Sequence, residues 1–237
     1  MKKYAILTLM CFLGLSMQAQ KVIEKTLNYN NQVIDLDVKF AHNIEVKTWD
    51  KQSVYFKANL TMKDSKYLEL YELDIDESSG SIEITSKPEP IFKKVQEEWK
   101  KKSSGKEEHY SWGDNEYQFD YILYVPKNAR FKVSSINGNL ASEIIEGQFE
   151  ADLINGDIEI AHYAGNFDLK TINGAIDLKM INANLKAETI HGDIYVDEKL
   201  NFKSTEKYVG QTISGQTAEG KNRLRLNTIN GNMYLRL

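Results

Sequence analysis

Residues 154–196 read INGDIEIAHYAGNFDLKTINGAIDLKMINANLKAETIHGDIYV, and this stretch decides the fold. Its corner motif recurs every eighteen residues, as Ile136-Asn137-Gly138, Ile154-Asn155-Gly156, Ile172-Asn173-Gly174 and Ile190-His191-Gly192. Halfway between these corners stand Gly147, Gly165 and Ala183, so a nine-residue rhythm runs from Ala129 to Leu200. Self-similarity at a short fixed period is typical of a solenoid, in which each repeat packs on its neighbours.

Each nine-residue unit has the pattern of one short strand. Apolar side chains occupy the third and fifth positions, and the positions between and after them are mostly charged. This alternation predicts a strand with one dry face and one wet face. The eighth position, filled by residues such as Ile145, Tyr163 and Ile172, is expected to turn back inward past the corner.

The corners predict how the strands stack. Asn-Gly tolerates positive φ, and this pair recurs only at alternate corners, so the two corners of one coil differ. We therefore predict an all-β, parallel β-solenoid, a right-handed β-helix or β-roll with about eighteen residues and two strands in each coil. Residue i then lies beside residue i+18, which pairs opposite charges at Lys170 and Glu188 and at Lys179 and Asp197.

The same motif predicts a ladder of turn residues along the stack. Asparagine side chains in one column can hydrogen-bond to each other, and a last copy of the motif stands near the C-terminus. The predicted ladder comprises Asn137, Gly138, Asn155, Gly156, Asn173, Gly174, His191, Gly192, Asn230 and Gly231. We interpret it as turn chemistry and stacking, and not as a binding motif.

The rest of the chain is organised around this repeat. Residues 1–19 read as a cleaved signal peptide, in which Lys2 and Lys3 precede an apolar run too short to span a membrane. Residues 20–32 form a polar lead-in, and residues 33–237 a single β-solenoid domain. Two segments interrupt the domain: a charged insertion at 89–116, predicted to hold a short helix and a loop, and a second loop at 207–221.

Composition favours an exported protein of the bacterial envelope. Cys11 is the only cysteine, so the chain without its signal has neither a disulfide nor a thiolate site. The formal net charge of −4 becomes −6 without Lys2 and Lys3, which argues against a nucleic-acid partner. We expect no transmembrane segment in the mature chain, and a location in the periplasm, at the outer-membrane periphery or on the cell surface.

Three features resemble a known family: the Ile-Asn-Gly corners, the step Val125-Pro126-Lys127-Asn128-Ala129 and the strand Ile44-Glu45-Val46-Lys47-Thr48-Trp49-Asp50. They are similar to the "putative adhesin" family of bacterial envelope β-solenoids, a domain of unknown function related to the head-GIN adhesin-like domains. The resemblance covers about residues 33–237 and implies a parallel β-solenoid and an exported protein. It implies no catalytic residue, and the insertion at 89–116 lies outside its pattern.

No catalytic or cofactor-binding constellation stands out, and we expect no cofactor. Calcium-binding rolls also repeat every nine residues, but they need an aspartate at each turn, and only two corners here approach that rhythm. Glu159 and Asp177 are expected to be neighbours on a flat face. They are candidates for a weak cation site or an acid–base pair, and the alternative is two solvated surface acids.

The insertion is the other candidate site. Loops as long as 89–116 are usually either functional or disordered. Three aromatic residues of this segment, Trp99, Tyr110 and Trp112, could contact a partner, and the alternative is a loop that is merely tolerated.

Two main classes of function follow. The first is a non-catalytic envelope or cell-surface module, adhesin-like or structural, that presents a flat face or the insertion to an unknown protein or glycan. The second is a polysaccharide-active enzyme on a β-helix scaffold, which rests on analogy of fold alone. An envelope-stress or signalling accessory protein is a further alternative. We favour the first class, because the repeat shows no cluster of catalytic groups beyond Glu159 and Asp177.

Overall fold

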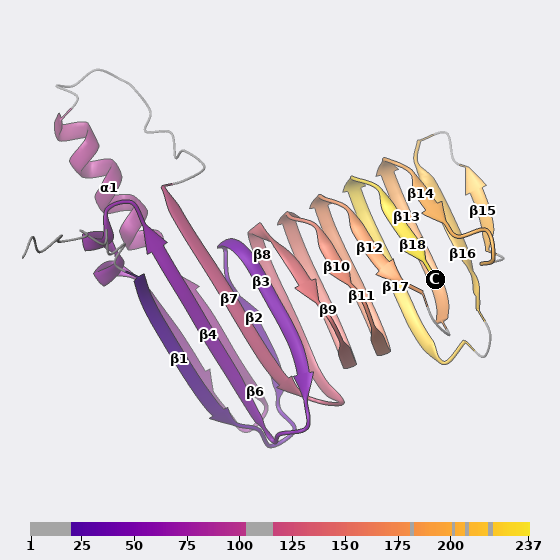
Figure 1. Cartoon of the computed structure of the whole chain (residues 1–237), viewed down its shortest axis with the longest axis horizontal. Helices are drawn as coiled ribbons and strands as arrows, with labels where there is room; N and C mark the ends of the chain where they lie inside the picture. The colour runs from indigo at the N-terminus through magenta and orange to yellow at the C-terminus, as the bar shows by residue number, and fades with distance from the viewer. Residues whose placement is uncertain (1–19, 103–115, 181–182, 201, 207–208, 218–219) are drawn as a thin grey trace, which may run out of the picture.

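The computed structural model describes residues 20–102, 116–180, 183–200, 202–206, 209–217 and 220–237. Most of these residues lie in β-strands, which form one large mixed sheet that does not close. One strand, β8 (Ala129–Ser142), bends at Gly138, where φ is 129°. Its two halves therefore belong to two successions of hydrogen-bonded strands, which we call row A and row B (Figure 1).

Row A contains the second half of β8. In order it comprises β1 (Gln20–Asn28), β4 (Ser53–Met62), β7 (Tyr117–Pro126), β3 (Phe40–Trp49), β8, β10 (Ile158–Ile160), β12 (Ile176–Lys179), β18 (Met233–Arg236) and β14 (Ile194–Val196).

Row B contains the first half of β8. In order it comprises β5 (Glu72–Glu77), β6 (Ser81–Lys87), β2 (Val33–Asp37), β8, β9 (Ile145–Asn155), β11 (Tyr163–Asn173), β17 (Asn222–Asn230), β13 (Ala183–His191), β16 (Gln211–Gln216) and β15 (Lys203–Glu206). The buried side chains of both rows belong to one core cluster.

The sheet is mixed and not parallel throughout, which corrects the prediction. Pairs in the middle are parallel, but β1–β4, β4–β7 and β5–β6 at one end and β13–β16 and β15–β16 at the other are antiparallel. The turn at Ser78-Ser79-Gly80 is one cause, because strands joined by a tight turn can only pair antiparallel.

The eighteen-residue register is confirmed between β8 and β12. Gly147 pairs with Ala129 on one side and with Gly165 on the other, and Ile158 pairs with Ile176. The two strands of a coil are unequal, however, since β9 and β11 each have eleven residues whereas β10 has three. The even nine-residue rhythm thus divides into a long strand of row B and a short strand of row A.

Beyond β12 the strands do not stack in the order of the sequence. The C-terminal β17 lies between β11 and β13, and β18 lies between β12 and β14. In Figure 1 these two yellow strands stand among orange ones. The predicted pairing of Lys170 with Glu188 is therefore wrong, because Asn227 separates the two. The expected pairing of Lys179 with Asp197 is also wrong, since Lys179 lies beside Arg236.

Among the described residues, the eighth position of the repeat faces inward at some corners and outward at others. Ile145 and Tyr163 are buried, but Ile154, Ile172 and Ile190 are 39%, 39% and 46% exposed. Alternation along the long strand is the reason. The inward residue opens a long strand, whereas the outward residue ends one just before the Asn-Gly corner.

The corners form a continuous ladder. Asn155 Nδ2 donates to Asn137 Oδ1 at 3.0 Å, Asn173 donates to Asn155 at 2.7 Å, and Asn230 donates to Asn173 at 2.7 Å. His191 follows next to Asn230 in the register. The neighbouring glycines also stack closely, since a Cβ on Gly174 would clash with the carbonyl oxygen of Gly156.

Several segments outside the repeat differ from expectation. The predicted polar lead-in at 20–32 contains β1, which pairs along its whole length with β4. The predicted loop at 207–221 contains β16, which pairs with β13 and β15. Only Leu27 of β1 and Ile213 of β16 are fully buried, so neither strand has an apolar run that the sequence could reveal.

Two helices cover the end of the sheet near β1 and β4 (Figure 1). They are the 3-10 helix η1 (Ser65–Leu70) and α1 (Glu89–Lys102), which buries Ile91 and Val95. The short helix predicted in the insertion at 89–116 is thus present as α1. Among the described residues, no helix is long and apolar enough to cross a membrane.

Candidate functional site

Glu159 and Asp177 lie side by side on β10 and β12, as predicted. Arg236 of β18 compensates Asp177, because its Nε donates to Oδ1 at 2.9 Å and its Nη2 to Oδ2 at 2.5 Å. Within the described ranges, no group of three or more histidine, cysteine, aspartate or glutamate side chains could hold a metal ion. Among these residues, no third carboxylate therefore joins the pair.

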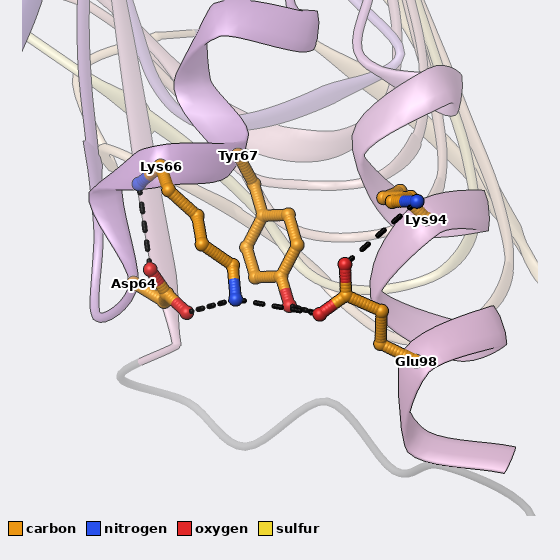
Figure 2. A network of polar contacts seen from close by, with 5 residues as sticks. All are labelled: Asp64, Lys66, Tyr67, Lys94 and Glu98. Atoms are coloured by element: carbon orange, nitrogen blue, oxygen red, sulfur yellow. Dashed lines mark hydrogen bonds and ion pairs between the residues drawn. The ribbon is translucent and has the colours of Figure 1, made fainter. Parts of the chain in front are cut away.

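Of the three aromatic residues predicted in the insertion, Trp99 lies in α1, and Tyr110 and Trp112 lie outside the described residues. Trp99 lines a cavity of about 250 Å³ with Tyr67 of η1 and Val95 and Glu98 of α1. Figure 2 shows the polar contacts at this junction. The Tyr67 hydroxyl donates to Glu98 Oε2 at 2.8 Å, and Lys66 Nζ lies 3.3 Å from the same oxygen.

The network also sets protonation states. The hydrogen bond from Tyr67 is the main cause that holds the pKa of the Glu98 carboxyl below its ordinary value. The pKa of Lys66 is raised, chiefly through hydrogen bonding to Tyr67 and to Asp64. Each charged side chain of this network has a partner of opposite charge within it. The contacts between Tyr67, Lys66 and Glu98 join α1 to η1.

A larger groove crosses the outer face of row B, and no sequence pattern predicted it. Its volume is about 430 Å³, and it runs over β2, β8, β9, β11 and β17. We call it the arginine groove, because three of the four arginines of the chain, Arg130, Arg223 and Arg225, line it.

Two parallel ladders of outward side chains form the floor of the arginine groove. The first runs Arg130, Gln148, Asn166 and Arg223, and the second runs Lys132, Glu150, Asp168 and Arg225. Each ladder therefore begins and ends with a cation and has two uncharged or acidic side chains between. The intercalated strand β17 supplies the cation at one end of both ladders.

A second groove lies further along the same outer face. Its volume is about 450 Å³, and its apolar part is formed by Ile172, Ile190, Ile229 and Val209. All four side chains are more than a third exposed, which is unusual for adjacent aliphatic residues. The eighth repeat position supplies Ile172, Ile190 and Ile229, and the sequence pattern did not reveal that these side chains face outward.

The outer face of row A carries aromatic side chains instead. Trp49 contacts Tyr124 and Tyr55 with ring centroids 5.1 Å and 6.2 Å away. At the far end of the row, Tyr195 and Tyr234 stack at 5.3 Å. Trp49 also donates to the carbonyl of Ser53 at 2.7 Å, which makes it part of the local turn.

Comparisons place this fold among known structures. No family model matches the chain, and no curated protein matches it significantly. A structure described as a "putative cell adhesion protein" from Clostridium sporogenes aligns with a TM-score of 0.52 and 12% identity over 92% of this chain and 99% of that one. A "putative adhesin" from Parabacteroides merdae aligns with a TM-score of 0.34 and 13% identity over 75% and 68% of the two chains. At 12% identity, the first alignment shows a shared fold alone.

Proposed function

We propose that this protein is a non-catalytic, exported module of the bacterial envelope or cell surface that binds a partner through the outer face of row B. In this proposal residues 1–19 are a cleaved signal peptide, and the coils from β8 onward form an adhesin-like β-solenoid. The structurally similar Clostridium sporogenes protein, described as a "putative cell adhesion protein", is compatible with that role.

One observation carries the proposal. The outer face of row B holds two grooves, of about 430 Å³ and 450 Å³, on strands whose inner faces are packed into the core. Binding sites on rigid strands are well ordered, and concave surfaces bury a ligand better than flat ones. The partner that we propose is a glycan or protein of the envelope or of the surroundings of the cell.

Adherence of the purified protein to intact bacterial cells and to envelope fractions tests this function. Asn166→Glu and Ile172→Lys each place a charged side chain in one groove of row B at an exposed position. We expect at least one of them to abolish adherence. Ala141→Lys, on the outer face of row A, is the matched control and should adhere normally.

The same material tests the enzyme alternative. A polysaccharide-active enzyme would release new reducing ends from envelope glycans, and Glu159→Ala would remove that activity if Glu159 and Asp177 acted as its acid–base pair. The Arg236 ion pair on Asp177 disfavours that role, because it occupies both oxygens of the carboxylate. Adherence lost only in the row A variant, or absent altogether, would contradict the proposed function.

A further inference from the structure

We propose that the arginine groove binds an acidic polysaccharide through carboxylate or sulfate groups on its sugar rings. This inference rests on the proposed binding function of row B and names its ligand class. The chain has 30 lysines and arginines, of which only four are arginines, and three of these four converge on the groove from strands β8 and β17. Arginine is the side chain that binds planar or branched oxyanions with two parallel hydrogen bonds.

The cationic side chains of β8 already have partners in the groove, whereas those of β17 are free of ion pairs among the described residues. Arg130 Nε donates to Gln148 Oε1 at 3.2 Å, and Lys132 lies 3.5 Å from Glu150 Oε1. In the part of the chain that the structure describes, neither Arg223 nor Arg225 takes part in an ion pair. Both are exposed on β17, with the buried Leu224 between them, so their guanidinium groups are open to a ligand.

The spacing of the cations points to an extended ligand. From β8 to β17 there are three strand spacings, which separate the two cationic ends of the groove by roughly 14 Å. A single phosphate or sulfate can engage one end only, whereas a chain of linked acidic sugars can engage both. The amides of Gln148 and Asn166 lie between, where they suit sugar hydroxyl groups.

The acidic side chains of the groove distinguish among polyanions. Glu150 and Asp168 lie in the middle of the second ladder, and Asp35 lines the groove on β2, where burial is the main cause of its raised pKa. These carboxylates repel a ligand with a charge at every step, such as a nucleic acid, but they accept hydrogen bonds from hydroxyls. A polysaccharide with acidic groups set apart by neutral hydroxyls fits the alternation of charge.

Titration of the purified full-length mature protein with oligogalacturonate and with a heparin-derived oligosaccharide tests the proposal. We expect at least one of them to bind, with an affinity that falls as salt rises. Fully methyl-esterified oligogalacturonate, which keeps the hydroxyls and loses the charge, should bind at least about tenfold more weakly. The double variant Arg223→Gln/Arg225→Gln should show a similar loss. Arg236→Gln removes the fourth arginine, outside the groove, and should bind within about twofold of the unchanged protein.

Each contrary result has a distinct meaning. The acidic-glycan site is overturned if the Arg223→Gln/Arg225→Gln variant binds the acidic oligosaccharide as tightly as the unchanged protein does. It is also overturned if the unchanged protein binds the methyl ester as tightly as the acidic oligosaccharide. Binding confined to vesicles of phosphatidylglycerol overturns it in favour of a lipid phosphate. If no acidic oligosaccharide binds while Asn166→Glu or Ile172→Lys still abolishes adherence to cells, this inference fails and the proposed function stands. The circular dichroism spectrum of each variant should match that of the unchanged protein, which shows that a loss of binding is not caused by unfolding.

Discussion

Asn230 Nδ2 donates a hydrogen bond to Asn173 Oδ1 at 2.7 Å, although fifty-seven residues separate them in the chain. The contact joins the last corner of the sequence to the third, and it continues the ladder that begins at Asn137. The contact forms because β17 and β18 insert between strands that precede them in the sequence.

Removal of one rung should weaken the whole stack. Asn173 both donates to Asn155 and accepts from Asn230, so Asn173→Ala removes two side-chain hydrogen bonds. We expect a loss of about 1 kcal/mol in the free energy of unfolding, since the side chains are exposed to water. Urea denaturation measures it. Asn184→Ala, on an exposed position away from the ladder, should change the free energy by less than about 0.5 kcal/mol.

Engineered cysteines test the order of the strands. In a chain with Cys11 replaced by serine, Lys170→Cys/Asn227→Cys should form a disulfide on oxidation, because the two positions are register partners. Lys170→Cys/Glu188→Cys should not form it, since β17 lies between and the Cα atoms are about two strand spacings, roughly 10 Å, apart. Non-reducing electrophoresis with peptide mapping detects the disulfide. A disulfide in Lys170→Cys/Glu188→Cys and none in Lys170→Cys/Asn227→Cys would show that the strands stack in the order of the sequence.

Gly165 has no room for a side chain. Its φ is +134°, and a Cβ would clash with the carbonyl oxygen of Gly147. Gly165→Ala should therefore destabilise the protein by about 2–4 kcal/mol, seen as a lower midpoint of urea unfolding. Gly80→Ala is the matched control, because nothing lies within 4 Å of its Cβ position. A midpoint that falls equally in both variants would refute this account of the corner.

Alkaline pH should destabilise the end of the sheet near α1. Tyr121 is 1% exposed, and its buried hydroxyl lies 2.9 Å from Ser86 Oγ. Burial is the main cause that raises its pKa well above the ordinary value of 10.0. The unfolded chain then loses this proton near pH 10 while the folded chain keeps it, so the free energy of unfolding falls as pH rises above 10.

A control for this pH dependence is a variant that lacks the buried hydroxyl. Tyr121→Phe removes the titrating hydroxyl, so the free energy of unfolding of this variant should fall less steeply between about pH 10 and pH 11. Denaturant titrations at several pH values compare the two proteins. Equal slopes would show that Tyr121 is not a source of the pH dependence.

The junction in Figure 2 should control how firmly α1 is held. Tyr67→Phe removes the donor to Glu98, and we expect faster protease cleavage within α1 with little change in global unfolding. Lys94→Ala removes only a 3.8 Å pair on the helix surface and should leave the cleavage rate unchanged. Equal rates for all three proteins would mean that apolar packing by Ile91 and Val95 holds α1 alone.

The sequence predicted best where the repeat is contiguous. From Ala129 to Lys179 each corner follows the last along the chain, so spacing alone gives the register of β8, β9 and β11. The short helix predicted in the insertion is likewise present as α1, whose buried residues Ile91 and Val95 are four apart and share one helix face. In these segments, local pattern and tertiary structure agree.

Prediction failed where a choice between equivalent partners was needed. The motif Ile229-Asn230-Gly231 fits next to Asn173 as well as the motif at His191 does, although the eighteen-residue spacing and the expected charge pairing favoured the motif at His191. The arginine groove depends on that choice, since Arg223 and Arg225 reach it only through the position of β17. Antiparallel strands near the ends of the two rows, such as β1 and β16, are held mainly by backbone hydrogen bonds, which the side-chain pattern does not reveal.

The intercalated strands also give the folding chain a competitor to its native state. A chain that forms its coils from the N-terminal side completes β13 before β17 exists, and β13 can then pair directly with β11 in the sequential register. Formation of the native stack requires that pairing to open and admit β17 and β18. The arrangement predicted from the sequence is therefore a competing strand order that the folding chain must avoid.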